Sequence, residues 1–189
     1  MKIISIGDKW IAAGVNRDPK VTLLEDPMQT LERLRSGASG LIIQIFDATP
    51  VVSVRQIHAA AVATYLAFKA GTNISKKFEI EFLLRLAADT QINRAIKRLG
   101  VKPDSREVGF CIIGDDERIV SKTADYASQI IGGSDMSDEE LRAEDRLEKA
   151  VEFYGISEAE IESVQAPSKA DAILLLILEH IATLDLKRR

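Results

Sequence analysis

The chain has 189 residues, of which 46% are hydrophobic and 29% charged, and its formal net charge is −4. This length and composition favour a soluble globular protein with a single domain over residues 1–189. The single cysteine, Cys111, excludes an intramolecular disulfide and fits a reducing compartment. The start MKIISIGDKW lacks the long apolar core of a secretory signal, and the longest apolar run, Ile173–Leu178, is too short to span a bilayer. We therefore expect a cytoplasmic protein that does not insert into a membrane.

The N-terminal part of the chain alternates short apolar runs with turn residues. Lys2–Ile6 and Leu41–Phe46 are rich in Ile and Leu and are bounded by Gly and Asp, so both are predicted to be buried strands. Weaker strand candidates lie at Ile11–Val15 and Val21–Leu24. Pro27–Arg35 carries its apolar residues on one side and ends at a Ser-Gly pair, which predicts a helix.

Three consecutive helices are predicted in the middle of the chain. The first follows Ser53, which forms the capping-box pattern with Gln56, and it runs to about residue 70. Its body AAAVATYLA is so rich in small residues that another backbone can pack closely against it. The second begins at Asn73 or Ser75. The third is capped by Asp89 or Thr90 and ends at Gly100, with Ile92, Ala95, Ile96 and Leu99 expected to face inward.

The second half begins with the clearest strand of this region, EVGFCII at Glu107–Ile113. Helices are predicted after it at Ser121–Ile131, Met136–Tyr154, Ser157–Val164 and Ala170–Leu186. Strands on both sides of a helical middle indicate an α/β or α+β fold, in which several helices pack on a small mixed sheet.

Charge is distributed unevenly along the chain. Residues 69–102 hold 8 basic and 3 acidic residues, whereas residues 104–162 hold 17 acidic and 6 basic residues. The third predicted helix concentrates positive charge, because Arg94, Lys97 and Arg98 follow at i, i+3 and i+4 on its outward face. A basic helix face binds phosphate or nucleic acid in some proteins and is only a solvated surface in others, and the spacing leaves both interpretations open.

The C-terminal helix is predicted to be apolar on more than one side. Consecutive residues of a helix turn by about 100°, so the run Ile173–Leu178 cannot face a single core. Either the helix is fully buried in the domain, or one apolar strip remains for a partner. The candidate partner contacts are Leu174, Ile177, His180, Ile181 and Leu184, and the spacing does not decide which of them complete the core.

Signatures of catalysis are missing from the sequence. It contains no GxGxxG, GxxxxGK[ST], GxSxG, HExxH or CxxC motif. His58 and His180 are too few for a metal site, and Asp115 with Asp116 is better explained as a solvated turn after a strand. We therefore expect no metal, no cofactor and no enzymatic activity.

Several segments together resemble one known family. They are IIQIFDA at residues 42–48, the helix containing His58, GTNISKKFEIEFLLRLAADTQINRAIKRLG at residues 71–100, and the ending ILEHIATLDLKRR. This pattern resembles the small kinase-binding subunit of the KEOPS complex, the family that includes the human PRPK-binding protein. The resemblance is strongest over residues 41–115 and 177–189.

The resemblance implies a non-catalytic subunit of the machine that makes threonylcarbamoyl-adenosine (t6A) in tRNA. Such a subunit binds and stimulates the complex's small atypical kinase/ATPase, reaches the other subunits indirectly, and holds the 3′ CCA end of tRNA. Single-stranded tails are held by positive charge together with polar and stacking contacts to bases. The residues expected to hold RNA are Lys69, Lys76, Lys77, Arg85, Arg94 and Lys97 by charge, and Asn73 and Gln91 by polar contacts. The alternative is a protein-only regulatory adaptor of the kinase whose basic face binds no RNA.

Overall fold

The computed structural model describes residues 1–188, an α+β structure that divides into two compact units. Each unit is assembled from two separate stretches of the chain. Unit 1 comprises Met1–Ala48 and Arg98–Ser137, and unit 2 comprises Thr49–Lys97 and the chain from Asp138 onward. The expected α+β class is confirmed. Within residues 1–188, no helix is long and apolar enough to cross a membrane.

Unit 1 contains the sheet. Its four main strands lie in the order β1-β2-β4-β3, a short fifth strand pairs with β2, and every pairing is antiparallel. The sheet is therefore not the mixed sheet that the sequence predicted, because each neighbouring pair runs in opposite directions. The strands are β1 (Lys2–Ile6), β2 (Lys9–Arg17), β3 (Ile42–Asp47), β4 (Glu107–Gly114) and β5 (Ser134–Asp135).

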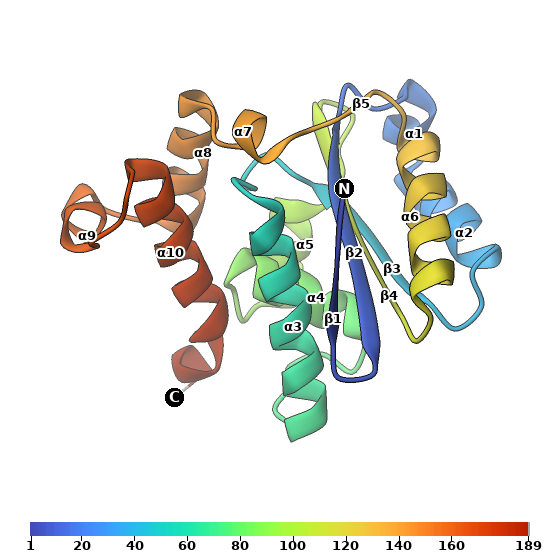
Figure 1. Cartoon of the computed structure of the whole chain (residues 1–189), viewed down its shortest axis with the longest axis horizontal. Coiled ribbons are helices and arrows are strands. Elements are labelled where there is room, and N and C mark those ends of the chain that lie inside the picture. The colour runs from blue at the N-terminus through green and yellow to red at the C-terminus, as the bar shows by residue number, and fades with distance from the viewer. Residues whose placement is uncertain (189) are drawn as a thin grey trace. The chain divides into compact units, whose positions relative to one another are not determined.

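Helices cover one face of this sheet in unit 1. Figure 1 shows α1 (Val21–Glu25), α2 (Pro27–Ser36) and α6 (Glu117–Ile131) along that side. Their buried side chains pack with alternate residues of the strands, such as Phe110 and Ile112, into one hydrophobic core. Only every second residue of a strand faces the same side, so the apolar residues that alternate along the strands decide which face of the sheet carries this core.

The prediction of a strand at Val21–Leu24 is wrong, because this segment forms the single turn of α1. In a strand, Val21 and Leu23 would face the same side, but Leu23 is buried and Val21 is 67% exposed. The turn ends at Asp26, whose carboxylate accepts a hydrogen bond from the Gln29 amide at 2.9 Å and so caps the next helix.

Unit 2 is helical. Its longest helix, α3 (Val54–Ala70), packs against α4 (Phe78–Ala87) and α10 (Lys169–Ala182). A buried polar bridge supports this packing: Gln56 donates to the Tyr154 hydroxyl at 2.7 Å, and that hydroxyl donates to the Leu86 carbonyl at 2.6 Å. The remaining elements are α5 (Ile92–Leu99), whose last two residues are counted in unit 1, α7 (Asp138–Leu141), α8 (Glu144–Tyr154), α9 (Glu158–Ser163) and a 3₁₀-helix (Leu184–Arg188).

Several boundaries in unit 2 differ from the prediction. Ser53 caps α3 through the Arg55 amide, but Gln56 accepts from the Val52 amide, so the predicted capping box is not formed. The second helix begins at Phe78 rather than Asn73 or Ser75, because the preceding loop is held by a side chain of the helix itself. The single helix predicted over 136–154 is divided into α7 and α8, and the last helix ends at Ala182.

Candidate functional site

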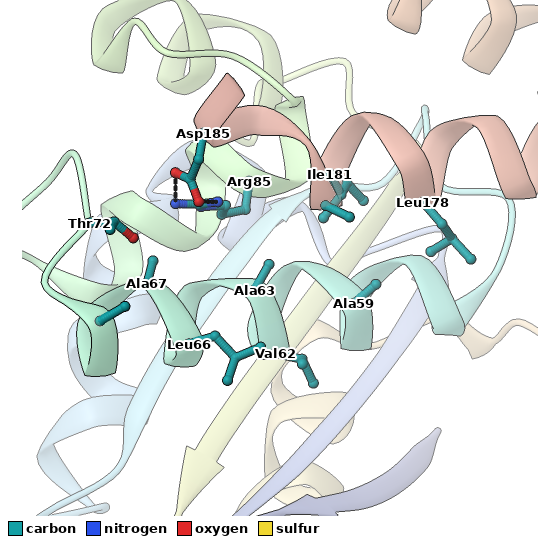
Figure 2. Close-up of a pocket in the computed structure, with 12 residues that line it drawn as sticks. Ala59, Val62, Ala63, Leu66, Ala67, Thr72, Arg85, Leu178, Ile181 and Asp185 are labelled. Atoms are coloured by element: carbon teal, nitrogen blue, oxygen red, sulfur yellow. Dashed lines mark hydrogen bonds and ion pairs between the residues drawn. The ribbon is translucent and has the colours of Figure 1, made fainter. Parts of the chain in front are cut away.

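An apolar groove of about 620 Å³ lies between α3 and the C-terminal end of α10 in unit 2. Ala59, Ala63 and Ala67 follow at i, i+4 and i+8 along α3, so their methyl groups form one strip on the helix surface. Side chains this small leave space between the two helices, as Figure 2 shows. The lining residues are Ala59, Val62, Ala63, Leu66, Ala67, Ala70, Thr72, Arg85, Leu178, Ile181, Ala182 and Asp185.

An ion-pair network centred on the buried Arg85 lies at the polar end of this groove. Arg85, 1% exposed, donates its Nε to Glu81 at 3.0 Å and its two terminal nitrogens to the Asp185 carboxylate at 3.0 and 2.7 Å. Figure 2 shows the pair of bonds to Asp185. Burial lowers the pKa of the Arg85 guanidinium, but the hydrogen bonds with Asp185 and Glu81 outweigh burial and raise that pKa. Arg85 is therefore a charged structural residue.

Arg85 was expected on an exposed basic face, and the structure corrects this expectation. Glu81 and Arg85 form the ion pair that a spacing of four residues on a helix favours, but they do so inside the protein. The side chain cannot reach an RNA without leaving two carboxylates, one of them fully buried. Local spacing missed this because Asp185 lies 100 residues further along the chain.

The loop before α4 carries the central part of the predicted RNA surface. Glu81 accepts hydrogen bonds from the Ile74 and Ser75 amides at 2.7 and 2.8 Å. The buried Ser75 hydroxyl accepts from the Lys77 amide at 3.1 Å. The side chains of Lys76 and Lys77 are exposed, so the loop has an ordered backbone and a positively charged outer surface.

Helix α5 carries another part of that surface. Lys97 and Gln91 are exposed, whereas the exposed Arg94 forms a bidentate ion pair with the buried carboxylate of Asp89, which raises the pKa of Arg94. The expected inward face is only half correct. Ala95 and Leu99 are fully buried, but Ile92 and Ile96 are 38% and 41% exposed, because the buried strip of this short helix is only one residue wide.

The remaining predicted RNA contacts lie at the end of α3 and in the loop. Lys69 is exposed with its ammonium 5.8 Å from the centre of the Tyr65 ring, and half-buried Asn73 donates to the Ser75 carbonyl at 3.0 Å. Unit 2 thus holds all eight predicted residues, on three segments: the end of α3, residues 72–85 and residues 91–97. Seven of them present at least part of their side chain to solvent, and Arg85 does not.

The C-terminal helix differs from its predicted partner face. Leu174, Ile177, Ile181 and Leu184 are buried, since α10 packs against α3, α4, α8 and α9. His180 is half-buried, with its ring centre 6.4 Å from that of Tyr154. Of the five candidates, only Ile181 lines the groove. Leu178 and the small side chains of α3, which were not among these candidates, also line the groove.

No metal-binding cluster of side chains is present in the part of the chain that the structure describes. Residues 1–188 contain no group of three or more His, Cys, Asp or Glu side chains able to hold a metal ion. Burial raises the pKa of the Cys111 thiol well above its ordinary value of 9.0, so this thiol is a core residue rather than a nucleophile.

Comparison with known proteins identifies one family. A family model described as "Kinase binding protein CGI-121" matches residues 24–185, which is most of the chain and covers parts of both units. A comparison with curated proteins finds no match.

Proposed function

Because the chain belongs to the CGI-121 family of kinase binding proteins, we propose that the groove between α3 and α10 receives its kinase. The observation that supports this proposal is the groove itself, whose lining is almost entirely apolar. An amphipathic helix can lay its apolar face into such a groove, and the alanines of α3 let its backbone approach closely. At the polar end, Thr72 and Asp185 offer hydrogen-bonding groups that can fix the register of the partner.

Arginine substitution on α10 tests this proposal. Leu178→Arg places a charge in the groove, where a docked partner would leave it without a counter-charge, so kinase binding should be lost. Leu175→Arg is the matched control, because Leu175 lies on the same helix, is 47% exposed and does not line the groove. Co-purification with the kinase should fail for Leu178→Arg and persist for Leu175→Arg. Retention by both folded variants would place the kinase elsewhere.

We further propose that this kinase is the small atypical kinase/ATPase of the KEOPS complex. The protein would then be a non-catalytic, cytoplasmic subunit of that complex, which makes t6A in tRNA. In this role it binds the tRNA 3′ CCA end. The local excess of 5 positive charges over residues 69–102, in a chain of net charge −4, supports the RNA role. The side chains assigned to RNA are Lys69, Asn73, Lys76, Lys77, Gln91, Arg94 and Lys97.

The RNA role predicts a dependence on both salt and the tRNA tail. Replacing Lys76 and Lys77 together with alanine should weaken tRNA binding and make the plot of log affinity against log salt shallower, since two phosphate contacts are lost. Lys149→Ala, at an exposed position of α8, is the control and should change neither. Removal of the CCA bases should also weaken binding by the unaltered protein. A salt response without tail dependence would support the protein-only adaptor instead.

A further inference from the structure

The side chain of Glu81 connects the loop over residues 72–77 to the core of unit 2. One carboxylate oxygen accepts from the Ile74 and Ser75 amides, and the other accepts from Arg85. Glu81 is fully buried, so these bonds replace the water that its charge would otherwise need. Two consecutive amides that share one oxygen hold the loop backbone in a fixed turn.

The orientation of Glu81 depends on residues outside the loop. Arg85 lies one helical turn further along α4, and the two bonds from Arg85 to Asp185 hold the plane of its guanidinium. Lys77, the N-cap residue of α4, makes no side-chain capping bond, so its side chain does not hold the start of the helix. The ion-pair network therefore fixes the position of the Glu81 carboxylate.

We propose that Glu81 is a positioning residue for RNA binding: it fixes the backbone of residues 72–77 so that Lys76 and Lys77 face the RNA in one geometry. The inference rests on the proposed RNA role. Ser75 points inward and is buried, so the two lysines that follow it are held outside by the same turn. A loop that is already ordered loses less conformational entropy on binding than a free loop.

Glu81→Gln in the full-length protein tests this role. The glutamine oxygen can face either the loop amides or Arg85, and its NH₂ group then meets donors on the other side. Amide hydrogen exchange at Ile74 and Ser75 should become faster, and tRNA affinity should fall about tenfold. The salt slope should remain that of the unaltered protein, because both lysines are still present.

The sign of the affinity change separates positioning from simple electrostatics. Removing a carboxylate near lysines strengthens RNA binding if only charge matters, whereas loss of positioning weakens it. Glu79→Gln makes the same change of charge two residues away on α4, and should leave binding equal or tighter. Circular dichroism and thermal unfolding check that both variants are folded. If Glu81→Gln is not folded, Asp185→Asn, at a side chain 41% exposed, should show the same pattern with a smaller loss.

Two results would overturn the inference. One is faster exchange in the loop with unchanged or tighter tRNA binding, which would show that loop order does not matter. The other is unchanged exchange at Ile74 and Ser75, which would show that Glu81 does not hold the loop. Failure of the RNA role itself looks different, because the unaltered protein would then show no tail-dependent tRNA binding before any variant is compared.

Discussion

Replacement of Arg85 by methionine distinguishes a buried structural arginine from a surface arginine. Methionine retains much of the apolar volume but removes three hydrogen bonds to two carboxylates. Loss of one partner of a buried ion pair typically costs about 3–5 kcal/mol, because the other charge stays buried without compensation. Here Glu81 keeps its two amide bonds, and Asp185 is exposed enough to be hydrated, so the lower end, about 3 kcal/mol, is expected.

Chemical and thermal unfolding measure this loss. For a chain of this size, about 3 kcal/mol corresponds to a fall of roughly 6–12 °C in the unfolding temperature. Lys97→Met is the control, since Lys97 is exposed and its replacement should leave the transition unchanged. A double-mutant cycle of Arg85→Met with Asp185→Asn should give a non-zero coupling energy. If Arg85→Met unfolds like the control, the guanidinium is not buried between these carboxylates and the reasoning is refuted.

Three further substitutions or treatments test other parts of the fold. Gly109→Ala should lower the free energy of unfolding by about 1–3 kcal/mol in thermal melts, because a Cβ there would lie 2.4 Å from the buried Phe46 ring. Gly37→Ala is the control and should be neutral, because a Cβ there meets no atom within 4 Å. The hydrogen bond from the α10 N-cap serine lowers the pKa of Asp171 below 3.8. The stability that the charged Asp171 contributes is therefore present above pH 3.8 and is lost as the pH falls through the lowered pKa. In an acid titration, Asp171→Asn should lose stability less steeply than the unaltered protein. A thiol reagent should label Cys111 only after unfolding, which mass spectrometry can follow.

Local patterns predicted the elements that depend on neighbouring residues. The strand predicted at Glu107–Ile113 is β4, and the helix predicted from Ser157 begins with a complete capping box to Glu160. Alternation and capping involve residues two to four positions apart, so the sequence contains all the information that they need. The prediction of a strand at Val21–Leu24 failed because so short a segment, with three apolar residues and Thr22, suits a strand or one helical turn equally well, and packing of Leu23 on the sheet decides between them.

The sequence by itself determined the α+β class, the concentration of positive charge over residues 69–102 and the small-residue surface of α3. Only the tertiary structure decided what each of these features contacts. Arg85 lies in the basic segment of the sequence, yet in the structure its buried guanidinium pairs with a carboxylate 100 residues further along the chain. Leu178 belongs to an apolar run with five neighbours, and only the packing of α10 against α3 places it in the groove. Contacts between distant segments depend on how whole elements pack, which no local period of the sequence records.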